Sequence, residues 1–127
     1  MKRFMLAMAM FAAFTMTAHA QAEIKFDKLI HNFGEFSEKA PIQKTTFTFT
    51  NTGDKPLVIN QAIASCGCTV PAYTKAPIAP GKTGQITVTY NGKGMFPGHF
   101  KKSITVRTNG NIEMTRLYIE GTMKEEK

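Results

Sequence analysis

Apolar and polar residues alternate along several short segments of this chain. In Thr45–Thr50, the side chains of Phe47 and Phe49 fall on one face and the threonines on the other. Gln85–Tyr90 and Lys102–Thr108 repeat the pattern. Alternation with a period of two is typical of a strand with one buried face, and it is common in antiparallel sheets. No stretch shows the 3.6-residue period of an amphipathic helix.

Turn-forming residues separate these segments. Asn51–Pro56 is dense in turn formers. Pro80-Gly81 suits the central positions of a type II turn, in which proline fixes one φ angle and glycine supplies the positive one. Asn109-Gly110 predicts a type I′ hairpin turn, which needs positive φ at both central residues. The segments on either side of each signal are therefore separate strands.

Two further segments need special geometry. Ile24–Phe26 and His31–Phe36 are interpreted as one bent or bulged first strand, with the bend at Gly34. Pro71 begins a proline-rich stretch that ends at Pro80, and proline cannot donate a hydrogen bond to a sheet ladder. We therefore expect Pro71–Pro80 to be loop or edge strand that guards one sheet edge in part.

About seven short strands with regular turn spacing and no helices predict an all-β, immunoglobulin-like antiparallel β-sandwich. One residue set is expected to point inward and form the core: Phe47, Phe49, Leu57, Ile59, Ile86, Val88, Ile104, Val106, Leu117 and Ile119.

The N-terminus has the form of a secretory signal peptide. A positive start, Met1–Arg3, precedes an apolar run, and Ala18 and Ala20 supply the small residues that a signal peptidase reads. We expect residues 1–20 to be removed between Ala20 and Gln21, leaving residues 21–127 as a single domain, periplasmic or secreted. The apolar run is shorter than the roughly 20 residues that span a bilayer, so no stable membrane insertion is expected after cleavage.

Charge changes this picture little. The formal net charge is +7, and the predicted cleavage removes two of the basic residues. The remaining lysines and arginines are spread along the chain, and only Lys101-Lys102 are adjacent outside the leader. Scattered cations are typical of solvated strand faces, so no nucleic-acid partner is expected.

The candidate chemistry lies in Cys66-Gly67-Cys68, which holds both cysteines of the chain. Residues i and i+2 of an extended strand lie roughly 6.5 Å apart, near the upper limit for a disulfide, and Gly67 can bend the backbone between them. Three interpretations stay open: a local strap in the oxidising envelope, a thiol–disulfide exchange pair, or two thiolates that hold a soft metal.

A metal site needs more ligands than two sulfurs. Outside the leader the histidines are His31 and His99, and Met95 lies close to His99 in the sequence. If their loop folds over Cys66 and Cys68, then Met95 and His99 complete a copper or zinc site. If the cysteines form a strap, no cofactor is expected.

Several motifs together resemble a known family. Thr50–Gly53, Ser65–Thr69, Ile78–Gly81 and Ile104–Val106 follow one another in an order similar to DUF1573, a bacterial domain-of-unknown-function family of exported proteins. The resemblance extends from His31 to Gly121. It implies an immunoglobulin-like fold similar to Hydin and major sperm protein domains, and it implies no particular activity.

The function predicted from the sequence is an exported, non-catalytic binding or scaffolding module of the cell envelope, with an envelope protein as its partner. No nucleophile elbow, phosphate loop or paired metal histidines are present, so no enzyme activity is expected. The alternative is a copper- or zinc-binding protein, or a thiol–disulfide exchange component, centred on Cys66 and Cys68.

Overall fold

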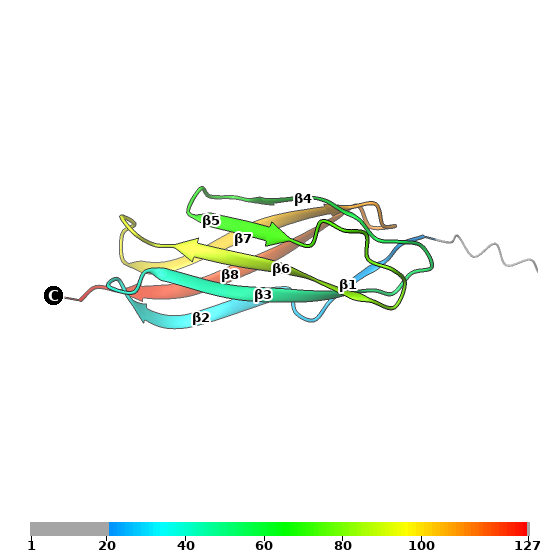
Figure 1. The fold of residues 1–127 in the computed structure, drawn as a ribbon. Helices are drawn as coiled ribbons and strands as arrows, with labels where there is room; N and C mark the ends of the chain where they lie inside the picture. The colour runs from blue at the N-terminus through cyan, green and yellow to red at the C-terminus, as the bar shows by residue number, and fades with distance from the viewer. Residues whose placement is uncertain (1–20, 127) are drawn as a thin grey trace, which may run out of the picture.

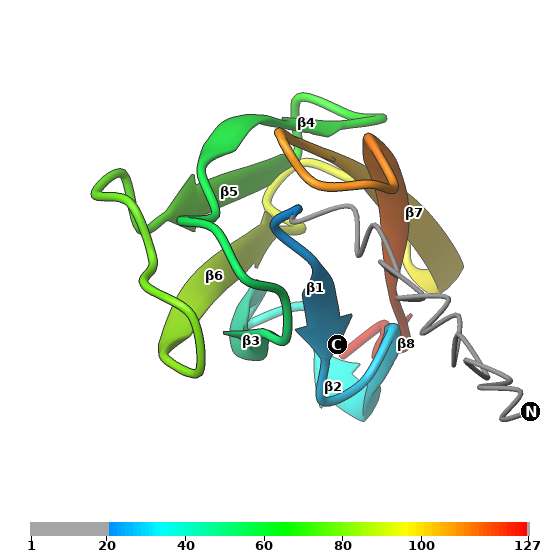
Figure 2. The ribbon, with the colours of Figure 1, turned by 90° about the vertical axis from the view of Figure 1, so that its right-hand side faces the viewer.

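The computed structural model describes residues 21–126, in which all regular secondary structure is β-strand. The predicted leader, residues 1–20, lies outside the described residues. Eight strands form two four-stranded sheets, ordered β1-β3-β6-β5 and β2-β8-β7-β4. Figure 1 shows the strands running along the length of the domain. Figure 2 views the same ribbon from one end and shows the strands of the two sheets arranged around the interior of the domain. The strands are β1 (Ile24–Phe26), β2 (Ile30–Ser37), β3 (Ile42–Asn51), β4 (Ile59–Ala64), β5 (Thr69–Tyr73), β6 (Thr83–Asn91), β7 (Gly98–Thr108) and β8 (Met114–Lys124).

The core confirms the alternation seen in the sequence. All ten residues predicted to point inward are buried, and none is more than 5% exposed. Tyr90 and Phe100 extend the core toward one end of the sandwich, where their rings stack with centroids 3.9 Å apart. The predicted all-β sandwich is therefore confirmed. No helix in residues 21–126 has the length and apolar character that a membrane crossing requires.

The interpretation of one continuous first strand is wrong. β1 pairs with β3 in the first sheet, whereas β2 pairs with β8 in the second. The chain changes sheets over three residues: the N–H of Asp27 still donates to Thr48 O at 2.9 Å, and Leu29 O already accepts from the N–H of Tyr118 at 2.8 Å. The split raises the strand count to eight, and because β2 runs parallel to β8, the sandwich is not wholly antiparallel.

The predicted irregularity at Gly34 is confirmed. Gly34 has a φ of 71°, and the register of β2 with β8 shifts between Asn32 and Glu35. The side chain of Asn32 accepts a hydrogen bond from the N–H of Gly34 at 2.7 Å. This Asx-type contact fixes the bulge in β2.

The two predicted turns have different outcomes. At Pro80-Gly81, Gly81 has a φ of 79° and the N–H of Lys82 donates to Ala79 O at 3.0 Å, as in a type II turn. The type I′ turn at Asn109-Gly110 is wrong, because neither residue has a positive φ. The Asn109 side chain instead bonds the segment that leads into β4. It accepts a hydrogen bond from Val58 N at 2.8 Å and donates one to Pro56 O at 3.1 Å.

Candidate functional site

The Cys-Gly-Cys motif forms the turn by which the chain crosses from the second sheet to the first. β4 ends at Ala64 and β5 begins at Thr69, so residues 65–68 connect the layers. Backbone hydrogen bonds hold both ends of this turn: Ser65 N donates to Ser103 O on β7 at 2.9 Å, and Asn91 N on β6 donates to Cys68 O at 2.8 Å. The turn is therefore attached to both sheets.

Cys66 and Cys68 form a disulfide, and their Cα atoms are 5.2 Å apart. The separation is shorter than in an extended strand because the N–H of Thr69 donates to Cys66 O at 3.1 Å, which closes a turn. Gly67 has no positive φ, and a Cβ atom built on it would meet nothing within 4 Å. The bend therefore does not depend on the conformational freedom of glycine.

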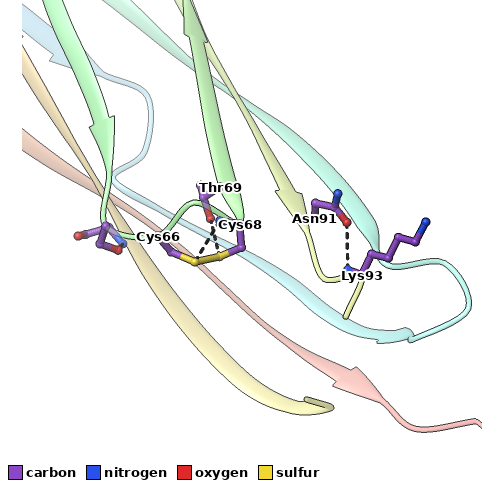
Figure 3. Close-up of a disulfide and its surroundings, with 7 residues drawn as sticks. Cys66, Cys68, Thr69, Asn91 and Lys93 are labelled. Carbon is purple, nitrogen blue, oxygen red and sulfur yellow. Dashed lines mark hydrogen bonds between the residues drawn. A yellow bond between two sulfur atoms is a disulfide. The ribbon is translucent and has the colours of Figure 1, made fainter. Parts of the chain in front are cut away.

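The two sulfur atoms have different surroundings, which Figure 3 shows at close range. The backbone N–H of Cys68 donates to Sγ of Cys66 at 3.1 Å. Sγ of Cys68 lies 3.6 Å from Oγ1 of Thr69, and Cys68 packs against the hydrophobic core. Both cysteines are half-buried. The side chain of Lys93, on the neighbouring loop, extends away from the disulfide in this view.

The structure does not assemble the metal site predicted from Cys66, Cys68, Met95 and His99. Within residues 21–126 no three His, Cys, Asp or Glu side chains gather as a metal-binding group, so His99 does not join the two cysteines. His99 sits at the start of β7 opposite Thr122, and both His99 and Met95 are exposed. In this form each sulfur is bonded to the other, so neither is a thiolate ligand.

His31 also lies apart from the cysteines. Its ring packs edge-on against Phe33, with centroids 4.8 Å apart, and its Nδ1 lies 3.0 Å from Nζ of Lys28. Burial, followed by the charge of Lys28, lowers the pKa of His31 below its ordinary value. A neutral imidazole at this position can accept a hydrogen bond from the lysine, which is a packing role on β2.

We expect Cys66→Ser to lower the free energy of unfolding by about 1 kcal/mol or less. The disulfide closes a very short loop, and a short loop removes little entropy from the unfolded chain. The backbone bonds of the turn persist without it. Urea unfolding followed by circular dichroism measures the change. A loss of several kcal/mol would mean that the disulfide holds the two sheets together.

The sheet edges are a second candidate site, one that reading the sequence did not locate. β1 covers only the end of β3, because Ile24–Phe26 pair with Phe49–Asn51. Among residues 21–126, the remainder of β3 from Ile42 to Phe47 has a strand partner on one side only, which is β6. We call Ile42–Phe47 the open edge of β3.

Neighbouring bonds show which peptide groups face outward along the open edge. Asn51 N donates to Lys82 O, so the odd-numbered residues of β3 bond toward β6. Thr48 O accepts from Asp27 N on the other side, so the even-numbered residues bond away from β6. The N–H and C=O groups of Ile42, Lys44 and Thr46 therefore point out of the sheet.

The edges formed by β5, β2 and β4 carry features that hinder pairing with a further strand. Asn91 N donates to Cys68 O and Thr74 N to Gln85 O, so Pro71 occupies an outward position of β5, and its missing N–H interrupts that edge. This confirms the predicted edge position of Pro71. β2 is bulged, and β4 has a register shift between Ile59 and Gln61. The open edge of β3 has neither proline nor bulge, and its register with β6 is continuous.

Solved structures share this fold at low sequence identity. A protein of unknown function from Porphyromonas gingivalis W83 matches with a TM-score of 0.73 and 14% identity over 87% of this chain, which spans about half (51%) of that protein. The ASH/PapD-like domain 7 of human CEP192 gives 0.63 and 10% identity, covering 89% of this chain and 93% of that domain. WR4, a major sperm protein family member from C. elegans, gives 0.51 and 11%, covering 80% and 97%.

No curated protein matches the chain. The family model "Protein of unknown function (DUF1573)" matches residues 24–123. This range includes the disulfide turn and all eight strands, except for Lys124, the last residue of β8. The resemblance noted from the turn motifs and the Cys-Gly-Cys segment is thereby confirmed, as is the predicted immunoglobulin-like fold of the major sperm protein type. The PapD-like domain of CEP192 shares that fold as well. The chain belongs to the DUF1573 family.

Proposed function

We propose that this protein is an exported, non-catalytic module of the cell envelope that binds another envelope protein. In this proposal, an extended segment of the partner pairs as an additional strand with the open edge of β3. Main-chain hydrogen bonds supply affinity in this mode of recognition, and side chains along the edge supply specificity. The observation that carries the proposal is the outward direction of the Ile42, Lys44 and Thr46 peptide groups on an edge without proline or bulge.

The side chains of the open edge indicate the chemistry of the partner. The even-numbered residues lie on the outer face of the sheet, where Ile42 is 59% exposed and Lys44 is exposed. A segment with an acidic residue opposite Lys44 and an apolar residue near Ile42 complements this edge. Two copies of β3 paired with Lys44 opposite Lys44 would place like charges together, which favours a different chain over self-association.

A proline substitution separates pairing at this edge from the stability of the domain. The N–H of Lys44 points out of the sheet, so Lys44→Pro removes an outward donor without removing a bond to β6. Lys44→Thr is the matched control, because it removes the same charge and keeps the N–H. We expect both variants to fold, as judged by circular dichroism.

Photo-crosslinking in cells provides the measurement. With a photoreactive amino acid in place of Ile42, we expect an adduct with an envelope protein in the periplasmic fraction, on a mature chain that begins at Gln21. Lys44→Pro should abolish the adduct, and Lys44→Thr should weaken it and leave its identity unchanged. An adduct that persists at full yield in Lys44→Pro would contradict the proposal.

A further inference from the structure

The disulfide turn offers a chemistry that strand pairing does not use. We propose that Cys66–Cys68 exchanges with the thiols of a protein dithiol, and that Cys66 is the sulfur that forms the mixed disulfide. This activity is independent of the open edge of β3.

Position and packing make the two sulfurs unequal. The turn lies at the surface, where Ser65 before Cys66 is exposed, whereas Thr69 after Cys68 is buried. Cys68 packs against the hydrophobic core, and Cys66 is not among the residues that do so. An incoming thiolate therefore reaches Cys66, while Cys68 stays close to the body of the domain.

Hydrogen-bond donors are in place for both sulfurs once the bond opens. The N–H of Cys68 already points at Sγ of Cys66 at 3.1 Å, and a backbone donor stabilises a thiolate more than a neutral sulfur. The hydroxyl of Thr69, 3.6 Å from Sγ of Cys68, can donate to the sulfur that leaves. Stabilised thiolates are good leaving groups and are populated enough to attack.

The fold can keep its shape while the disulfide opens. Three backbone hydrogen bonds hold the turn without the sulfurs: Thr69 N to Cys66 O, Ser65 N to Ser103 O, and Asn91 N to Cys68 O. The short loop that the disulfide closes contributes little to the stability of the folded state. Opening the bond therefore needs no unfolding of either sheet.

The exchange is a two-electron transfer in two displacements. The first partner thiolate attacks Sγ of Cys66, a bond forms between those sulfurs, the Cys66–Cys68 bond breaks, and its electron pair stays on Cys68. The second partner thiolate then attacks the partner's own sulfur in the mixed disulfide and displaces Cys66 as a thiolate. The partner dithiol is oxidised to a disulfide, this protein is reduced to the dithiol, and the two protons lost by the partner thiols go to the cysteines or to solvent.

The first experiment follows reduction of the native protein. The mature protein is incubated with reduced glutathione at neutral pH, and intact mass gives the fraction that has gained two hydrogens while circular dichroism reports the fold. We expect reduction with an unchanged spectrum. A disulfide that resists glutathione until urea unfolds the domain would overturn the proposal.

A matched pair of single-cysteine variants tests which sulfur reacts. Cys68→Ser leaves Cys66 with its backbone donor, and Cys66→Ser leaves Cys68 against the core. With oxidised glutathione we expect Cys68→Ser to form the mixed disulfide at least about tenfold faster, and to keep its rate to lower pH. Equal rates and equal pH profiles would overturn the assignment of Cys66.

The last experiment measures whether the protein disulfide oxidises the two thiols of a substrate peptide. The oxidised protein is mixed with a reduced peptide that contains two cysteines, and we expect one peptide disulfide to form for each protein disulfide consumed. The Cys66→Ser/Cys68→Ser double variant sets the background. Peptide oxidation no faster than this background would contradict exchange with dithiols. Loss of the crosslinked adduct at β3 has no bearing on this result, so the two proposals fail separately.

Discussion

Phe47→Ala is expected to lower the free energy of unfolding by about 3–5 kcal/mol, the range measured when a buried aromatic residue is truncated. Phe47 is fully buried in the middle of β3, opposite Ile86 of β6. Truncation removes the ring from the centre of the core and leaves a cavity that the paired strands cannot close. Because small domains unfold with about 5–15 kcal/mol in total, this single change should remove a large part of the stability.

Urea unfolding at constant temperature, with circular dichroism as the signal, measures the effect. Ile42→Ala on the same strand is the matched control, because Ile42 is 59% exposed. Its truncation should change the free energy of unfolding by only about 0.5 kcal/mol. Similar values for the two variants would show that β3 does not bury the face that carries Phe47.

Asn51→Ala is expected to lower the free energy of unfolding by about 2–4 kcal/mol, because its buried amide bonds four backbone groups and truncation removes all four hydrogen bonds. The side chain is fully buried at the end of β3. Its Oδ1 accepts from Gly53 N at 2.9 Å and Glu23 N at 3.3 Å. Its Nδ2 donates to Lys55 O at 2.7 Å and Ile78 O at 2.9 Å.

The position of these four bonds explains the size of the effect. They join the residue before β1, the loop after β3 and the segment before β6, so one amide fixes three stretches of chain at the same end of the sandwich. Water can replace the amide only in part, because the bond to Ile78 O is buried. Asn51→Asp should be at least as damaging, since a carboxylate oxygen would then face two carbonyl oxygens.

Asn91→Ala is the control for Asn51. Asn91 also ends a strand, but it is exposed and its side chain accepts a single hydrogen bond, from Lys93 N at 3.0 Å. We expect a loss of about 0.5 kcal/mol, as for most surface substitutions. Thermal and urea unfolding of both variants give the comparison. An Asn51→Ala protein as stable as Asn91→Ala would mean that solvent satisfies the four backbone groups.

The candidate sites were predictable to different degrees. The disulfide was one of three states that the spacing of Cys66 and Cys68 allowed, because two residues apart is compatible with a bond, free thiols or metal ligands. Met95 and His99 lie close together in the sequence, Met95 between β6 and β7 and His99 near the start of β7. Whether this segment approaches the cysteines depends on how β7 pairs with β8, which no local pattern encodes. The open edge of β3 left no signal in the sequence, since it arises from where β1 stops.

The alternation of side chains along the chain was sufficient to predict the ten core positions, most of the strands and the sandwich. Alternation is a property of each segment by itself: a strand with one buried face must place an apolar residue at every second position, whichever strand lies beside it. The proline and glycine at positions 80 and 81 were equally informative, because their allowed φ angles are intrinsic to those residues.

Only the tertiary structure decided how those segments combine. Ile24–Phe26 and His31–Phe36 have the same period whether they form one strand or two, and the contacts of Asp27 and Leu29 with opposite sheets separate them. Asn51 and Asn109 are both typical turn residues, but their roles differ in the structure. Asn51 is the buried centre of a hydrogen-bond network. Asn109 bonds the segment before β4 at Val58 and does not form the predicted type I′ turn. Partner choice depends on residues far along the chain, and a local pattern carries no record of them.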